Sequence, residues 1–374
     1  MINEHEHLEY MPSVFAVGDE YQIFSVFDCA AIVKVRIGGE EFYDDACGIL
    51  RSNVRIHHVS VPMSILDEAG EYTLVYQRIL ERKPYFPTSE EEKTLTVKFR
   101  PVRGTDINIY LMSDTHNLVK EPIAAGRYFG DELDLFVLAG DIPNHSGRVE
   151  NLHTIYEIAG AITLGECPIV FARGNHDTRG LHAEEFPWYV PNRNGKTYFT
   201  FRLGPVWGLV LDCGEDKNDD HPEYGGTVCF HNFRRTETKF IEKVAESGEY
   251  NADGIEYKLV ICHVPFTWVN PDETFAIEQA LYTHWCTVLR KTVKPDLMLC
   301  GHKHILDVSP VGSERDHLGQ PCPVVMGGVP ENINRRPDQS CGYTGCALTL
   351  SGRRARAVFN HNSGEIKLDE TIEL

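Results

Sequence analysis

The sequence predicts an α/β protein in which an all-β sandwich precedes a larger α/β domain. Two observations on the 374-residue chain predict this class. The first hundred residues hold short stretches of β-branched and aromatic residues separated by turn signals, which is typical of an antiparallel sandwich of about 100 residues. From Pro101 onward, near-continuous apolar stretches alternate with longer amphipathic ones, as in a sheet that helices cover on both faces. We therefore expect two domains, residues 1–102 and residues 103–374.

The first domain is expected to be an immunoglobulin-like or fibronectin-like sandwich, in which each strand turns one face inward. Turn signals such as Gly38-Gly39 and Asp67-Glu68-Ala69-Gly70 separate its strands. The expected strands are Tyr21–Phe27, Ala31–Ile37, Val54–Val61, Tyr72–Ile79 and Leu95–Phe99. This sequence offers no catalytic pattern. We expect the domain to cover one edge of the second domain, with binding of a partner or a sugar as the alternative.

The second domain is expected to contain buried strands connected by helices. Its expected strands are Ile107–Met112, Leu135–Ala139, Ile169–Ala172, Val206–Leu211, Leu259–Cys262 and Leu297–Cys300. Helices are expected within Val149–Leu164, Thr236–Ala245 and Phe275–Val293. Near the C-terminus, short strands return and are expected to complete a second sheet: Pro323–Met326, Cys346–Leu350, Arg356–Phe359 and Ile366–Ile372.

The charge balance argues against two classes of partner. The chain has 36 Lys and Arg against 55 Asp and Glu, a formal net charge of −19 at pH 7. Surfaces that bind nucleic acids or anionic membranes need clustered cations to displace counterions, so we expect neither partner. The N-terminal residues are acidic and no apolar run reaches the roughly 20 residues of a membrane span, which indicates a cytoplasmic protein. Small phosphorylated substrates held by metal ions remain compatible with this charge.

Polar side chains with metal-ligating chemistry follow five of the predicted strands. The carboxyl ends of the strands form the ligand crevice of an α/β sheet. We therefore expect these residues, which are far apart in the chain, to meet on one side of the molecule. In chain order they are Asp114 and His116, then Asp141, then Asn175 with His176 and Asp177, then His263, and finally His302 with His304.

Each of these motifs is a weak signal by itself. Asp219-Asp220-His221 repeats the first spacing, but no apolar strand leads into it, and Gly130-Asp131 repeats the second. The interpretation depends on five different motifs in order, each at a strand end. Glycine stands beside three of them, where close approach of the backbone is needed.

The ordered pattern of D-x-H, G-D, G-N-H-D, a single His and G-H-x-H resembles the signature of the calcineurin-like metallophosphoesterase superfamily. A β-sandwich before such a domain looks like the arrangement in purple acid phosphatases and related bacterial phosphoesterases. The resemblance implies a four-layer α/β/β/α sandwich for the second domain. It also implies a ligand set for two metal ions. One ion would be held by Asp114, His116, Asp141 and His304, and Asp141 would bridge to a second ion held by Asn175, His263 and His302.

Elementary chemistry supports a pair of metal ions in a phosphoesterase. Two divalent ions about 3.5–4 Å apart need a shared carboxylate, and hydrolysis needs both a metal-bound hydroxide and neutralised phosphoryl oxygens. We expect that hydroxide to attack phosphorus in line with the leaving group. Mixed nitrogen and oxygen ligands suit Mn, Fe, Zn, Co or Ni better than Mg or Ca, and they do not choose among these five metals.

Three further residues are candidates for contact with the substrate. The family position implies that His176 protonates the leaving oxygen or stabilises the transition state. Arg173 and Arg179 flank the same loop and either bind phosphate oxygens or form structural ion pairs. The chain departs from the family at Asn144, where many members have an Asp that orients the histidine and purple acid phosphatases have a Tyr that binds iron. Asn144 cannot supply that carboxylate, and the iron–tyrosinate colour is expected to be missing.

The expected function is metal-dependent hydrolysis of a phosphomonoester or a phosphodiester by a dinuclear centre. One alternative is a nuclease of the same superfamily, which the net charge of −19 disfavours. The other is a non-catalytic binding or scaffold protein that keeps the fold. Such a protein would have lost ligands, whereas all seven ligand positions here carry coordinating side chains. The sequence predicts neither the natural substrate nor the oligomeric state.

Overall fold

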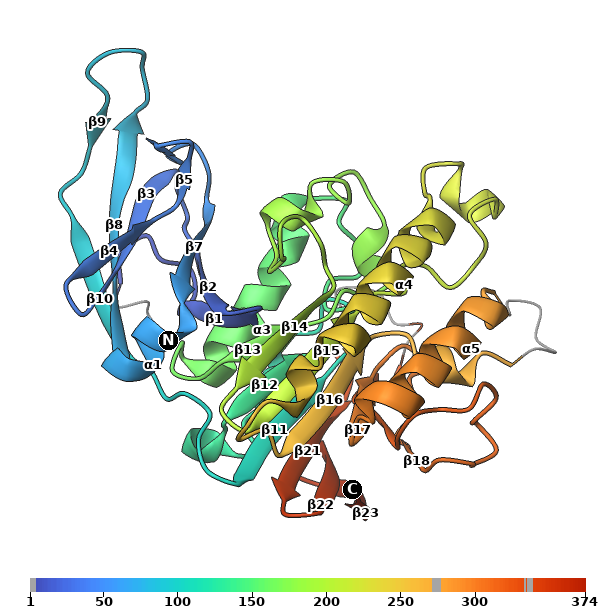
Figure 1. Ribbon diagram of the computed structural model, residues 1–374. Coiled ribbons are helices and arrows are strands. Elements are labelled where there is room, and N and C mark those ends of the chain that lie inside the picture. The colour runs from blue at the N-terminus through green and yellow to red at the C-terminus, as the bar shows by residue number, and fades with distance from the viewer. Residues whose placement is uncertain (1–4, 271–276, 333, 335–338) are drawn as a thin grey trace.

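The computed structural model describes residues 5–270, 277–332, 334 and 339–374. Two large β-sheets pack face to face, and helices cover the outer face of each (Figure 1). A smaller sheet from the first hundred residues lies at one end of the molecule, drawn blue to cyan. This arrangement is a mixed α/β fold with several sheets.

The first large sheet has ten strands, which come from both the N-terminal and the C-terminal part of the chain. Its centre is the parallel set β11 (Asp106–Met112), β12 (Leu135–Leu138) and β13 (Ile169–Phe171). One side continues with β21 (Tyr343–Ser351), β22 (Arg354–His361) and β23 (Ile366–Glu373), and β20 (Gly328–Pro330) pairs with β21. The other side continues with β1 (Ser13–Val17), β2 (Glu20–Val26) and β7 (Ile56–Pro62).

The second large sheet has six strands in the order β14, β15, β16, β17, β19, β18. Four of them are parallel: β15 (Val206–Leu211), β16 (Tyr257–Cys262), β17 (Leu297–Cys300) and β19 (Val324–Met326). The edge strands are β14 (Phe199–Leu203) and β18 (Val308–Ser309). Only β19 of the predicted C-terminal strands joins this sheet, because the other three extend the first one.

Alternation along each strand builds three apolar cores. In β11, Ile109 faces the core between the sheets and Tyr110 faces the outer core under the helices. In β16, Ile261 faces the core between the sheets and Val260 faces the outer core of the second sheet. Because both faces are buried, these strands read in the sequence as continuous apolar runs. Helices α2 (Lys120–Gly126) and α3 (His153–Thr163) cover the first sheet, and α4 (Phe230–Ser247) and α5 (Gln279–Val288) cover the second.

The predicted helices lie where they were expected. The stretch Val149–Leu164 contains α3, which a 3₁₀ turn at Val149–Leu152 precedes, and Thr236–Ala245 lies inside α4. The predicted stretch Phe275–Val293 contains α5 and a π turn at Leu289–Val293, while its first two residues lie outside the described residues. Within the described part of the chain, no helix has both the length and the apolar character that a membrane span requires.

The first hundred residues do more than form a separate sandwich. The small sheet has the order β10 (Lys93–Lys98), β8 (Glu71–Glu81), β3 (Ala31–Ile37), β4 (Glu40–Tyr43), and β9 (Thr88–Ser89) pairs with β8. A two-stranded sheet of β5 (Asp45–Ala46) and β6 (Ile49–Leu50) and the helix α1 (Met63–Ala69) accompany it. Strands β1, β2 and β7 instead belong to the ten-stranded sheet.

Strand β1 makes this connection, and the sequence analysis did not anticipate it. β1 runs parallel to β13 with Phe15 opposite Ile169, and the Gly18 N–H donates to the Thr200 carbonyl of β14. All five residues of β1 are buried, as expected of a strand inside a sheet. The first hundred residues and the rest of the chain therefore share one sheet, and the boundary near residue 102 stays a prediction.

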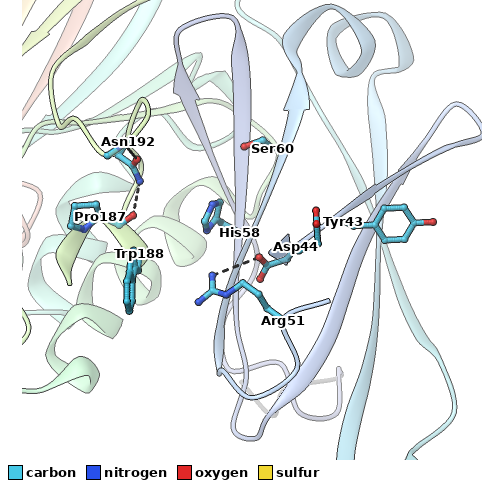
Figure 2. A pocket seen from close by; sticks show the side chains of 10 residues that line it. Tyr43, Asp44, Arg51, His58, Ser60, Pro187, Trp188 and Asn192 are labelled. Carbon is cyan, nitrogen blue, oxygen red and sulfur yellow. Dashed lines mark hydrogen bonds and ion pairs between the residues drawn. The ribbon is translucent and has the colours of Figure 1, made fainter. Parts of the chain in front are cut away.

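A cavity of about 640 Å³ lies where the N-terminal strands meet the segment after β13. Figure 2 shows His58 and the Arg51–Asp44 ion pair on the N-terminal side of this cavity and the exposed Trp188 on the other side. None of the predicted metal ligands lines this cavity.

Candidate metal centre

The five predicted motifs meet at the carboxyl ends of strands from both large sheets. Strand β11 leads into Asp114 and His116, β12 into Asp141, and β13 into Asn175 and His176. In the second sheet, β16 leads into His263, and β17 leads into His302 and His304. The structure brings all seven predicted ligands together, so the cluster lies across the junction of the two sheets.

The backbone takes an unusual conformation at these residues. Asp114, His116, Asp141, His302 and His304 have φ angles of 54°, 45°, 55°, 74° and 50°. A left-handed conformation costs a residue with a Cβ atom on the order of 1 kcal/mol or more. Such strain is concentrated at functional sites, where the surrounding structure holds it in place.

Three glycines beside the motifs permit this close packing. A Cβ atom on Gly140 would lie 2.6 Å from the backbone nitrogen of Gly174, and one on Gly174 would overlap the Asp141 carboxylate. A Cβ atom on Gly301 would lie 2.6 Å from Asp114 Oδ2. The prediction that glycine stands where the backbone approaches closely is confirmed at these positions.

One group of side chains forms around Asp114. Its Oδ1 atom lies 3.0 Å from His304 Nε2 and 3.9 Å from His116 Nε2, and the two imidazole Nε2 atoms are 3.1 Å apart. The His302 backbone N–H donates to the other oxygen, Oδ2, at 2.9 Å. The Asp114 carboxylate is therefore fixed by the backbone on one side and faces two imidazoles on the other.

A second group forms around Asn175. Its Oδ1 atom lies 3.1 Å from His263 Nε2 and 3.0 Å from His302 Nδ1, and His263 Nε2 lies 3.2 Å from Asp141 Oδ2. Asp141 also comes within ligand range of His116, on the side of the first group. Asp141 thus touches both groups, as a bridging ligand must.

These spacings fit metal ions. Imidazole and carboxylate ligands lie about 2.0–2.2 Å from a transition-metal ion. At that radius, neighbouring ligands are about 3.0 Å apart in an octahedron and about 3.4 Å apart in a tetrahedron. The distances of 3.0 to 3.2 Å in both groups match this range. The Nδ1–H of His263 also donates to the Ala139 carbonyl at 2.6 Å, which directs the Nε2 lone pair into the site.

Neighbouring charges and burial shift the pKa values of the groups in the cluster. Burial by itself would raise the pKa of Asp141, but His263 and the neighbouring imidazoles hold that pKa well below its ordinary value. Burial would lower the pKa of His263, but Asp141 and Asp114 raise it to about 10. Burial lowers the pKa of both His302 and His116 to about 4. In the metal-free protein Asp141 and His263 therefore form a buried ion pair.

His176 lies at the opening of the cluster with its side chain 28% exposed. Its backbone N–H donates to Asp141 Oδ1 at 2.8 Å, and its Nε2 atom is 4.0 Å from Asp141 Oδ2. Its Nδ1 atom is 2.9 Å from the backbone carbonyl oxygen of Asn144. A backbone carbonyl, and not a carboxylate, therefore orients this imidazole.

The two arginines have different surroundings. Arg173 Nε lies 2.7 Å from Asp212 Oδ2, and its guanidinium stacks on the rings of Phe230 and Phe233. These contacts match the structural alternative for Arg173. Arg179 instead reaches His176, with Nη1 3.3 Å from His176 Nε2.

The sequence analysis assigned no role to two acidic residues beside the site. Glu215 and Asp216 follow β15, and Asp216 Oδ2 lies 3.6 Å from His302 Nε2. Glu215 pairs with Arg179. The signal that reveals the other motifs was present here too, because an apolar strand ends at Leu211 and polar residues follow.

Comparisons with known proteins agree with this geometry. The profile of the calcineurin-like phosphoesterase family matches residues 107–306, more than half of the chain. Purple acid phosphatase PPD1 from yellow lupin (Lupinus luteus) seeds has a similar structure, with a TM-score of 0.61 and 12% identity over 100% of this chain and 75% of that one. A structure of PhoD has a TM-score of 0.56 and 12% identity over 98% and 91%. No curated protein matches the sequence.

Proposed function

We propose, on the premise that this chain belongs to the calcineurin-like phosphoesterase family, that it hydrolyses a phosphomonoester or phosphodiester with two divalent metal ions. Family membership makes the chain a metal-dependent phosphoric ester hydrolase. The number of ions, the ligand assignment and the role of His176 are the further content of this proposal.

The position of Asp141 carries the proposal. The first ion would be held by Asp114, His116, Asp141 and His304, and the second by Asp141, Asn175, His263 and His302. The spacing of 3.2 Å between Asp141 and His263, and the place of Asp141 beside His116, support one carboxylate shared by two ions. The mixed nitrogen and oxygen donors favour Mn, Fe, Zn, Co or Ni.

The chain's own residues would divide the remaining tasks. When bound, two divalent ions activate water and neutralise phosphoryl oxygens. The outer hydrogen bonds of Asp114 and His263 hold these ligands in orientation, which avoids reorganisation during the reaction. The partial exposure of His176 at the opening supports a contact with the phosphoryl group or the leaving oxygen.

The remaining parts of the proposal concern the rest of the chain. The net charge of −19 supports a small phosphorylated substrate rather than a nucleic acid, and a cytoplasmic location is expected. The small N-terminal sheet, with β1, β2 and β7, is proposed to form a sandwich-like cover at one edge of the catalytic fold.

The test is turnover by metal-stripped protein with Mn, Fe, Zn, Co, Ni or Mg added back separately. The substrates are p-nitrophenyl phosphate and bis-p-nitrophenyl phosphate, and bound metal is counted by elemental analysis. We expect turnover only with a transition metal, at about two ions per chain. Metal-independent turnover, or full activity at one ion per chain, contradicts the dinuclear assignment.

A further inference from the structure

The segment between β15 and α4 places a buried carboxylate against the loop that carries His176. Glu215 is only 1% exposed and accepts four hydrogen bonds. Two come from Arg179, with Nε 2.6 Å from Oε1 and Nη2 2.8 Å from Oε2. The others come from Thr178 Oγ1 at 3.2 Å and the Tyr224 hydroxyl at 3.1 Å. A bidentate ion pair between an arginine and a carboxylate fixes the plane of the guanidinium.

The third contact of Arg179 determines the hydrogen bonding of His176. A carbonyl oxygen only accepts, so His176 Nδ1 donates its proton to the Asn144 carbonyl. A guanidinium only donates, so His176 Nε2 accepts from Arg179 Nη1 at 3.3 Å. In this arrangement Nδ1 is the donor and Nε2 the acceptor, so Nε2 offers no hydrogen-bond donor to a leaving group.

Arg179 keeps donors for a ligand. A guanidinium has five N–H groups, and the contacts to Glu215 and His176 use three of them. One of the remaining two is on Nη1, which also has Glu223 Oε1 at 3.7 Å, and the other is on Nη2. Since His176 Nε2 lies 4.0 Å from Asp141 Oδ2, the Nη1 end of Arg179 lies at the opening of the metal centre.

We propose that Arg179 donates hydrogen bonds to a phosphoryl oxygen of the substrate, that Glu215 is its positioning residue, and that the preferred substrate is a phosphomonoester. This inference rests on the proposed function. Two divalent ions held at this site would each polarise one phosphoryl oxygen as Lewis acids. A monoester has a third unsubstituted oxygen for Arg179, whereas a diester has only two.

The reaction balances without a proton from His176. Water supplies an oxygen to phosphorus as the bond between phosphorus and the leaving oxygen breaks. A proton that originates from the same water ends on the leaving oxygen. The products are an alcohol and inorganic phosphate. Arg179 and His176 exchange no atoms, and Arg179 stabilises the charge on the phosphoryl group.

The test compares Arg179→Gln, Arg179→Lys and Glu215→Gln on p-nitrophenyl phosphate and bis-p-nitrophenyl phosphate. Arg356→Gln is the matched control, because Arg356 forms the same bidentate ion pair with Asp369, and both side chains are exposed on strands β22 and β23. For Arg179→Gln we expect kcat/KM for the monoester to fall about 10²-fold or more, and for the diester less than about 10-fold. The kcat/KM values of Arg179→Lys and Glu215→Gln are expected to lie between those of the wild type and Arg179→Gln. The kcat/KM values of the control are expected to match those of the wild type.

Two further measurements separate this role from a structural one. Bound metal is expected to stay at the wild-type value in all variants. The inhibition constant of inorganic phosphate is expected to be about 10-fold or more higher for Arg179→Gln than for the wild type. If Arg179→Gln loses metal or unfolds, Arg179→Lys and Glu215→Gln decide the question by the same monoester-to-diester ratio. An unchanged ratio in an active enzyme overturns the inference but leaves the proposed function standing. A wild-type protein that is inactive on both esters with every metal overturns both.

Discussion

Asp141 Oδ2 lies 3.2 Å from His263 Nε2 across the junction of the two large sheets. Asp141 follows β12 in the first sheet, and His263 follows β16 in the second. The same aspartate lies beside His116 of the first sheet. One carboxylate therefore joins the two ligand groups and the two layers of the fold.

Replacing this shared carboxylate should remove both metal ions. We expect Asp141→Asn to lower turnover at least about 10³-fold and to reduce bound metal well below two ions per chain. Asp131→Asn is the control, because Asp131 follows Gly130 in the same dipeptide but lies in an exposed 3₁₀ turn. Elemental analysis and p-nitrophenyl phosphate hydrolysis check both variants. Wild-type metal content with full activity in Asp141→Asn would remove Asp141 from the centre.

Metal binding should release a proton from His263. Its pKa is raised from 6.5 to about 10 because the charges of Asp141 and Asp114 outweigh the effect of burial. The protonated imidazole therefore stabilises the metal-free fold fully below pH 6.5, and this contribution is lost as the pH rises through about 10. A metal ion must displace this proton from Nε2, so metal affinity should rise with pH in the same interval.

Calorimetric titration of metal-stripped protein at pH 8 in two buffers with different ionisation enthalpies measures this release. We expect the apparent binding enthalpies in the two buffers to differ by at least about the difference between the buffers' ionisation enthalpies, which corresponds to one released proton. The melting temperature of the metal-free protein should fall between pH 7 and pH 10, and that of the metal-loaded protein should fall less. Binding heats that do not depend on the buffer would contradict the raised pKa.

Strand β1 should be essential to the catalytic fold. Phe15 is fully buried between β13, Phe24 and Tyr156. We expect Phe15→Ala to lower the free energy of unfolding by about 3–5 kcal/mol. Phe86→Ala is the control, since Phe86 is 87% exposed, and it should change stability by less than about 0.5 kcal/mol. Urea unfolding followed by circular dichroism checks both variants. If Phe15→Ala is as stable as the wild type, the first hundred residues contribute little to the shared sheet.

The cluster of candidate metal ligands could be predicted because these residues follow strands with a strong local signal. β11, β12, β13, β16 and β17 are buried on both faces, so each forms an apolar run, and each polar motif after such a run stands out. The glycines at positions 140 and 174 add a second signal, because a Cβ atom at either position would overlap neighbouring atoms.

Contacts between distant segments carry no such signal. The pairing of Phe15 with Ile169 joins segments about 150 residues apart, and β1 itself has only five residues. The partner of His176 is the backbone carbonyl of Asn144, which every residue type possesses. Glu215 follows a predicted strand, but its pairing with Arg179 depends on the course of a loop that the sequence pattern does not determine.

An iron-loaded form of the protein should have no tyrosinate colour. The family position that holds an iron-binding Tyr in purple acid phosphatases is Asn144 here. Tyr343 is buried nearby, but its hydroxyl donates to the Ser113 backbone carbonyl at 2.6 Å. We expect the visible spectrum of protein loaded with ferric iron to lack a charge-transfer band. A purple or pink product would show that a tyrosine reaches the metal.

His176 should matter for turnover but not for protonation of the leaving group. Its Nε2 atom accepts from Arg179 and its Nδ1–H donates to Asn144, so its removal loosens Arg179 rather than removing an acid. We expect His176→Ala to keep its bound metal and to lose about 10²-fold in kcat. The loss should be equal for p-nitrophenyl phosphate, whose leaving group needs no proton, and for an alkyl phosphate, whose leaving group does. Arg148→Ala, an exposed residue of a neighbouring loop, is the control. A much larger loss on the alkyl ester would identify His176 as the general acid instead.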